Sequence, residues 1–144
     1  MLAAMLDKLD VAGVFVEGLT KEDMPAFIII SRVLARKENS PYKIILQHGA
    51  AGKLYRDGKL KEVLPLDDEA AMQAANPVKD GKVKIDKTAN EKREDAMVLN
   101  LLTRKGIVVV ILGGAHDLTD NLRGKAAYLR VKTKAYLRAA DGSR

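Results

Sequence analysis

The sequence predicts an α/β fold in which a partly parallel sheet is covered by helices, with a basic edge strand at the C-terminus. Two observations carry this prediction. Short apolar runs with strand character alternate with stretches of helical periodicity, and the apolar run 107–112 directly follows the longest helical pattern. With 144 residues, 47% of them apolar and no Trp, the chain is large enough for one aliphatic core. We therefore expect a single domain over 1–138 and a loose tail at 139–144.

The first elements are expected to be a helix, a strand and a second helix. Leu and Met recur at helical spacing over 2–9, and the apolar stretch VFVE at 14–17 then ends in the carboxylate of Glu17. Thr20 and Asp23 resemble a capping box with Asp in place of Glu. They predict a long helix that buries four apolar side chains: Met24, Phe27, Ile28 and Val33.

The middle of the chain is expected to continue this alternation. Its length and small residues favour a helix over 42–55, and a short strand is expected over 60–66. Asp67 is positioned to cap a helix over 68–75, which Asn-Pro would terminate.

The last third is expected to hold the longest helix and two strands. The helix would be capped by Asp86 or Thr88 and would reach Arg104, just before the buried strand 107–112. Residues 128–137 alternate between apolar and basic side chains, a period of two that predicts an edge strand with one wet face.

Charge and composition exclude some function classes. The net charge of +6 is concentrated near the C-terminus, but no nucleic-acid motif accompanies it, so nucleic-acid binding is not expected. The absence of Cys excludes disulfides and thiolate metal sites. The chain shows no signal peptide and no apolar run long enough to span a bilayer, and it gives no further indication of cellular location.

Two predicted strands end in ionisable residues, Glu17 and His116. Because ligands of open α/β sheets bind beyond the carboxyl ends of parallel strands, these two side chains are candidates for one shared site. There they would act as acid and base or would share a metal ion. The structural alternatives are equally open: Glu17 as a helix cap or an ion-pair partner, and His116 as a hydrogen-bonded turn residue.

Gly113 and Gly114 precede His116 in the stretch LGGAHDLTDN. This stretch satisfies neither the dinucleotide-binding fingerprint nor the phosphate-binding loop. The glycines are therefore expected to let the backbone turn tightly and to bring His116 close to a ligand or a neighbouring strand.

The long helix contributes a third group. Arg93, Met97 and Asn100 fall on one stripe of its surface, so Arg93 is expected to be buried and to need a partner. Glu17 and Asp95 are the candidate partners. The other histidine, His48, lacks a ligand-type neighbour at helical spacing and is interpreted as structural.

These motifs, in this order, resemble a superfamily that includes TraB/GumN-like proteins, ChaN-like haem-binding lipoproteins and erythromycin esterases. The resemblance rests on VFVE ending at Glu17, on the helix motif R-[DE]-x-x-M-x-x-N at 93–100, and on the G-x-x-H ending at His116. It implies an α/β fold whose polar site unites Glu17, Arg93 and His116. Active members are hydrolases, some resemble metal-dependent proteases, and the esterases activate water with His and Glu.

The resemblance also implies roles for the site residues, and it indicates that one motif of the family is missing from this sequence. Glu17 and His116 would be bases or ligands of a divalent metal ion, and Arg93 an orienting cation. Surrounding residues would be Asp95, Asn100, Gly113, Gly114 and Asp117. The family's earlier strand ending in G-x-x-H or G-E-x-H has no counterpart here, so the chain is expected to be the C-terminal portion of a larger domain or a truncated relative. Two candidate functions follow: a hydrolase acting on a small molecule or peptide, or a non-catalytic ligand-binding or interaction domain. The oligomeric state is not predicted.

Overall fold

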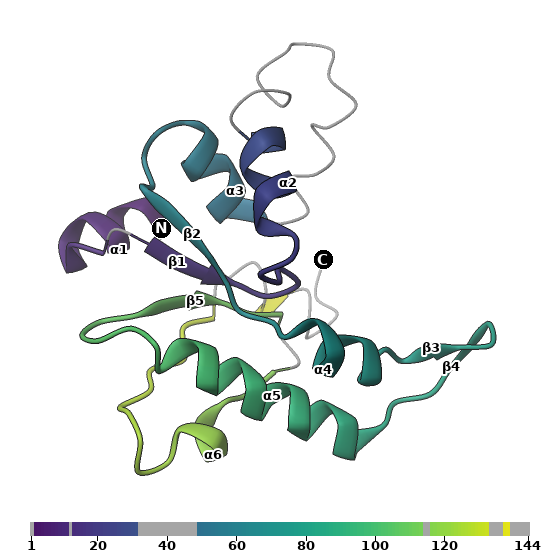
Figure 1. Ribbon diagram of the computed structural model, residues 1–144. Helices are drawn as coiled ribbons and strands as arrows, with labels where there is room; N and C mark the ends of the chain where they lie inside the picture. Colours follow the sequence, from purple (N-terminus) through teal and green to yellow (C-terminus); the bar gives the residue numbers. More distant parts are fainter. Residues whose placement is uncertain (1, 12, 32–48, 114–115, 133–136, 139–144) are drawn as a thin grey trace.

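A three-stranded parallel sheet forms the centre of the molecule (Figure 1). The computed structural model describes residues 2–11, 13–31, 49–113, 116–132 and 137–138. The strand order is β2-β1-β5, where β1 is Gly13–Val16, β2 is Glu62–Pro65 and β5 is Val109–Ile111. Val14 of the central strand pairs with Val63 on one side and Val109 on the other. The predicted α/β class is therefore confirmed, with all three strands of this sheet parallel.

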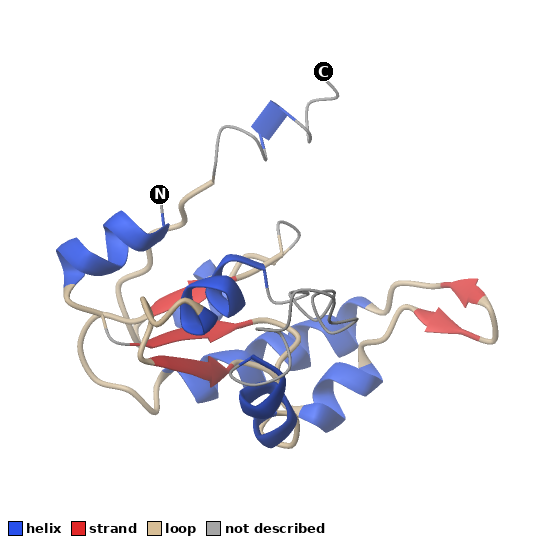
Figure 2. Cartoon of the chain, turned by 90° about the horizontal axis from the view of Figure 1, so that it is seen from above, coloured by secondary structure: helices blue, strands red, loops and turns tan. Residues whose placement is uncertain are grey.

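Helices lie on both faces of the sheet, as Figures 1 and 2 show. The helices on one face are α1 (Leu2–Leu9), α2 (Met24–Ile29) and α3 (Gly49–Arg56). Those on the other are α4 (Glu69–Ala74), α5 (Lys87–Leu101) and α6 (Thr119–Leu122). None of the helices in the described part of the chain has the length and apolar character needed to cross a membrane.

The central strand separates two hydrophobic cores because alternate side chains of a strand point to opposite faces. Val14 and Val16 contribute to the core beneath α1, α2 and α3. Phe15 contributes to the second core, with Leu66 from the segment after β2 and Met97 from α5. This second core packs α5 against the sheet, and the predicted site residues Glu17 and His116 follow β1 and β5 at the carboxyl edge of that sheet.

Local sequence signals explain where several helices begin. The side chain of Asp86 accepts a hydrogen bond of 3.0 Å from Ala89 N–H and caps α5, as predicted. Thr20 and Asp23 form the expected reciprocal bonds, with Asp23 N–H donating to Thr20 Oγ1 at 3.3 Å, but these bonds close the turn before α2, whose N-cap is Asp23 without a side-chain cap bond. The prediction for α4 was one residue out, since its capping side chain is Asp68. Asp67 has a different role, described below.

Two other predictions were wrong for the described residues. Residues 128–132 belong to no strand, and the apolar side chain of Leu129 is 85% exposed. Alternation alone cannot create a strand without a neighbouring edge and a core to face. Residues 133–136 and the tail 139–144 lie outside the described residues, as do Val33 and most of the segment between α2 and α3. Ile28 is exposed, whereas Phe27 is buried as expected.

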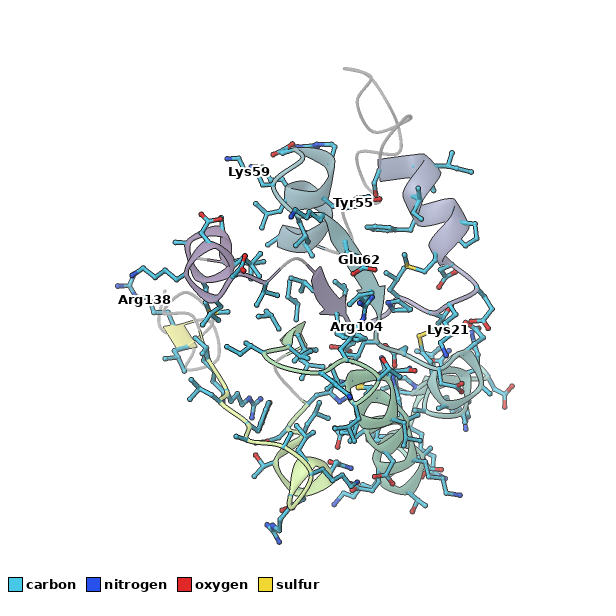
Figure 3. All side chains as sticks on the ribbon, turned by 60° about the vertical axis from the view of Figure 1, so that its left-hand side comes forward. Lys21, Tyr55, Lys59, Glu62, Arg104 and Arg138 are labelled. Carbon is cyan, nitrogen blue, oxygen red and sulfur yellow. The ribbon has the colours of Figure 1, made fainter. Side chains whose placement is uncertain are left out.

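The amino ends of the strands carry an exposed ion pair. Arg104, which follows α5, donates to Glu62 Oε1 at 2.8 Å, and both side chains are about half exposed. Figure 3 labels both residues. An open pocket of ≈ 160 Å³ adjoins them, with Asp10, Lys105 and Ile107 also in its wall.

Candidate functional site

Glu17, the residue immediately after β1, is the centre of the carboxyl-end cluster. Its N–H donates to Ile111 O at 3.1 Å, which holds its backbone beside β5. Its Oε1 lies 3.1 Å from His116 Nε2 and 3.4 Å from Arg93 Nη2, and its Oε2 accepts a hydrogen bond from Gly113 N–H. Burial opposes ionisation of Glu17, but the hydrogen bonds from His116 and Gly113 outweigh it and lower the pKa of the carboxyl. Glu17 is therefore an anion held by three donors.

Arg93 on α5 is held mainly by Asp67. Arg93 Nε donates to Asp67 Oδ1 at 2.7 Å and Nη2 donates to Asp67 Oδ2 at 2.9 Å, a two-point ion pair. The Asp67 side chain is fully buried, and it also accepts Gly18 N–H at 2.6 Å. Burial disfavours the charged guanidinium, but the bonds to Asp67 more than offset this and raise the pKa of Arg93. Asp67 thus fixes the cation that faces Glu17.

His116 lies between two carboxylates. Its Nε2 faces Glu17, and its Nδ1 lies 2.8 Å from Glu94 Oε1, one residue after Arg93 on α5. The hydrogen bond with Glu17 raises the pKa of the imidazole, and the bond with Glu94 adds to this against the opposing effect of burial. A ring bonded to carboxylates through both nitrogens is best satisfied as the doubly protonated imidazolium, which donates from both.

An open hollow lies beside the cluster, at the carboxyl ends of β1 and β5. Its volume is ≈ 360 Å³, and its walls are mainly aliphatic side chains and glycine backbone. Glu17 is the ionisable side chain among the described residues of that wall, and Gly113 also lines it. A small molecule in this hollow would therefore meet a carboxylate whose charge and direction are already fixed.

The three residues predicted to converge, Glu17, Arg93 and His116, do come together. Asn100 supports them indirectly: its side-chain amide donates to Leu66 O at 2.9 Å and so holds the backbone beside Asp67. Asp95 was the other predicted partner of Arg93, but Asp95 accepts a hydrogen bond from Asn121 at 3.0 Å instead. The additional partner of Arg93 is Asp67.

Asp117, predicted as a surrounding residue, bonds instead to the backbone and hydroxyl of Thr119 and lies 2.8 Å from Arg130. These bonds lower the pKa of Asp117, the Thr119 hydroxyl having the largest effect. Gly114 and His48 lie outside the described residues.

No protein-family model, curated protein or solved structure matches this chain. The function must therefore be argued from the geometry and chemistry of this cluster.

Sequence reasoning missed Asp67 and Glu94, although a signal existed for each. Asp67 follows a predicted strand just as Glu17 does. The expectation that ligands bind beyond the carboxyl ends of parallel strands, which selected Glu17, therefore applied to Asp67 equally. Glu94 precedes Met97, Val98 and Leu101 by three, four and seven residues, and all three are buried. A carboxylate on that stripe had to face the interior and meet a donor there.

The donor set offers a poor fit to a resident divalent metal ion. Among the described residues, no group of three or more His, Asp or Glu side chains is arranged to hold one. Glu17 and His116 are bonded to each other, and the guanidinium of Arg93 lies against the oxygen that a metal would need. A metal at Glu17 and His116 thus stays a prediction that would require further ligands and the displacement of a cation.

Gly113→Ala is expected to disturb the cluster while leaving the fold intact. A Cβ at this position would lie 2.9 Å from Glu17 Oε2, so the flexible carboxylate must move away. Because Glu17 is the largest cause of the raised pKa of His116, that pKa should fall toward its ordinary value of 6.5. Imidazole titration by ¹H–¹⁵N NMR, with the His116→Gln spectrum for assignment, measures the change. An unaltered titration in a folded Gly113→Ala protein would contradict this account of how Gly113 positions Glu17.

Proposed function

We propose that this chain is a ChaN/TraB-like domain that hydrolyses a small ester or amide by acid–base catalysis at Glu17 and His116. The observation that carries the proposal is the continuous chain of contacts Glu94–His116–Glu17, which ends at the hollow. An oriented imidazole next to a carboxylate, beside a space for a ligand, is a proton-transfer pair. The meeting of Glu17, Arg93 and His116 supports the family resemblance, since the resemblance implies that these three residues share a site.

The charges suggest how the two groups would divide the work. Glu17 is anionic, so it would accept a proton from a water molecule bound in the hollow as that water attacks the substrate carbonyl. The raised pKa of His116 favours its protonated form, which would give its proton to the leaving oxygen or nitrogen as the bond to the carbonyl carbon breaks. The 3.1 Å contact between Glu17 Oε1 and His116 Nε2 would then return the proton from Glu17 to His116. No metal ion is needed for this cycle.

The neighbouring side chains would serve by positioning. Glu94 would hold the imidazole at Nδ1 so that Nε2 points to Glu17, and Asp67 would hold Arg93 against Glu17. The aliphatic walls, from Val16, Ile111 and Leu112, would take an apolar part of the substrate. The modest size of the hollow favours a small molecule or the end of a peptide.

Hydrolysis of p-nitrophenyl esters and chromogenic peptide amides by the purified full chain tests the proposal. We expect His116→Gln and Glu17→Gln each to lower kcat/KM by roughly 10²–10⁴-fold. Asp117→Asn is the matched control, because Asp117 bonds to Thr119 and Arg130 instead of the cluster, and it should stay within about twofold. A chelator should leave the rate unchanged. The proposal fails if the parent hydrolyses nothing above background, or if the folded His116→Gln and Glu17→Gln proteins match it.

A second candidate is non-catalytic ligand binding, and one observation favours it. Both ring nitrogens of His116 are bonded to carboxylates, so a substrate must displace one of these contacts before the ring can act. Under this alternative, a compound from the same panel would raise the melting temperature of the parent without being cleaved. Binding without cleavage would therefore favour non-catalytic ligand binding over hydrolysis as the function.

A further inference from the structure

The hairpin between α4 and α5 projects from the body of the molecule. Its strands are β3 (Val78–Lys79) and β4 (Lys82–Val83), and Figures 1 and 2 show them extending away from the central sheet. Asp80 and Gly81 join them with positive φ angles of 53° and 71°, the backbone that a two-residue hairpin turn requires. Neither strand belongs to the sheet that carries the candidate site.

The hairpin has an aliphatic face and a basic face. Val78 pairs directly with Val83, and residues directly opposite in an antiparallel pair point to the same side. Lys79 pairs with Lys82 and therefore occupies the other side. Val83 is 76% exposed and Ile85, two residues further on, is 68% exposed. Within the described residues, these aliphatic side chains belong to neither hydrophobic core.

The hairpin and its flanking residues carry a positive net charge. Residues 77–87 contain four lysines and two aspartates, and all of them are exposed. One aspartate, Asp86, is bonded to the N-terminus of α5 through Ala89 N–H. That hydrogen bond is the largest cause of its lowered pKa, and the positive charges of Lys79 and Lys84 add to it. The hairpin therefore combines a local excess of positive charge with exposed aliphatic side chains.

We propose that the β3–β4 hairpin docks this protein on an anionic membrane surface. The aliphatic side chains of Val78, Val83 and Ile85 would enter the boundary between headgroups and acyl chains. The lysines would extend along the hairpin to the lipid phosphates. This inference is independent of the proposed hydrolysis, since no hairpin residue contacts Glu17, Arg93 or His116 among the hydrogen bonds and ion pairs of the described residues.

The side-chain chemistry favours lipid over nucleic acid. Residues 77–87 contain no aromatic residue and no Arg, the side chains that stack on bases and grip phosphates in two-point fashion. Val and Ile gain free energy only by leaving water, which a bilayer interface permits and an RNA surface does not.

Co-sedimentation of the full chain with vesicles tests the proposal. Vesicles of phosphatidylcholine with phosphatidylglycerol should carry down the protein, and vesicles of phosphatidylcholine alone should carry down far less. Lys79→Gln with Lys82→Gln should weaken binding about fivefold for each lysine removed, whereas the control pair Lys59→Gln with Lys61→Gln, exposed elsewhere, should have a smaller effect. Equal binding to both vesicle types, or binding to an RNA oligonucleotide in place of vesicles, overturns the proposal.

A tryptophan probe tests insertion separately from adsorption. The chain has no Trp, so Val83→Trp introduces a single reporter in the hairpin. Its emission should shift to shorter wavelength when anionic vesicles are added, because the indole leaves water. Leu99→Trp is the matched control, since Leu99 is 69% exposed on α5. A shift for Val83→Trp alone supports docking through the hairpin; no shift, or equal shifts at both positions, contradicts it.

Discussion

Replacing Arg93 with Met is expected to destabilise the protein by about 3–5 kcal/mol, the cost of removing one partner of a buried ion pair. The reason is Asp67, whose side chain is fully buried and which would lose both guanidinium bonds. Gly18 N–H would then be its sole remaining donor among the hydrogen bonds described above. Urea denaturation followed by circular dichroism measures the loss.

Two variants sharpen this test. Arg104→Met also removes an ion pair, but both side chains of that pair are about half exposed, so the expected loss is at most about 1 kcal/mol. In the double variant with Arg93→Met and Asp67→Leu, no buried charge is left unpaired, and much of the lost stability should return. If Arg93→Met costs no more than Arg104→Met, the pair with Asp67 does not anchor α5 to the sheet.

His116→Gln is expected to alter how stability depends on pH. The pKa of His116 is raised above 6.5, so its protonated form contributes stability fully below 6.5, and this is lost as pH rises through the folded-state pKa. The pKa of Glu17 is lowered below 4.5, so its contribution is present above 4.5 and is lost as pH falls through the folded value. The contact between them should therefore stabilise the fold most between pH 4.5 and 6.5.

Urea midpoints of the parent and His116→Gln, measured across that range and into alkali, check this result. Their difference should be largest in the window and should shrink as the imidazole of the parent loses its proton. Glu94→Gln should move the alkaline limit of the window to lower pH, because the bond to Glu94 raises the pKa of His116. Asp95→Asn is the control on the same helix, since Asp95 bonds to Asn121. A constant difference at every pH would show that His116 acts by packing alone.

Most of what could be predicted about the site came from one rule, that ligands of open α/β sheets bind beyond the carboxyl ends of parallel strands. It placed Glu17 and His116 at one edge of a parallel sheet, and helical periodicity placed Arg93 facing them. The same rule would have included Asp67, but its position before a helix favoured capping, a role that Asp68 fills. Local signals could not decide between two adjacent aspartates, because the deciding contact comes from α5, 26 residues later.

The limits of the fold prediction have the same physical origin. A continuous apolar run identified β1, whose side chains are buried on both faces of the sheet, and helical spacing identified α5, which buries Met97, Val98 and Leu101. Residues 128–132 repeat a strand pattern as well, yet Leu129 and Val131 face solvent, because a period of two specifies an extended backbone and leaves its neighbour undefined. The exposure of Ile28 is likewise a tertiary outcome, set by which side of α2 meets the sheet.

The spacing of the cluster along the chain has a consequence for synthesis on the ribosome. Glu17 contacts Arg93, 76 positions later in the chain, and Gly113, 96 positions later. Its carboxylate can therefore form these contacts only after both segments have been synthesised. The central strand likewise cannot pair with β5 until the segment after α5 has emerged. Such long-range closure slows folding, because the entropy of a long loop must be lost before its contacts form. β1 therefore leaves the ribosome well before its partner β5, and during that interval the edge of β1 that will pair with β5 stays unpaired in the nascent chain.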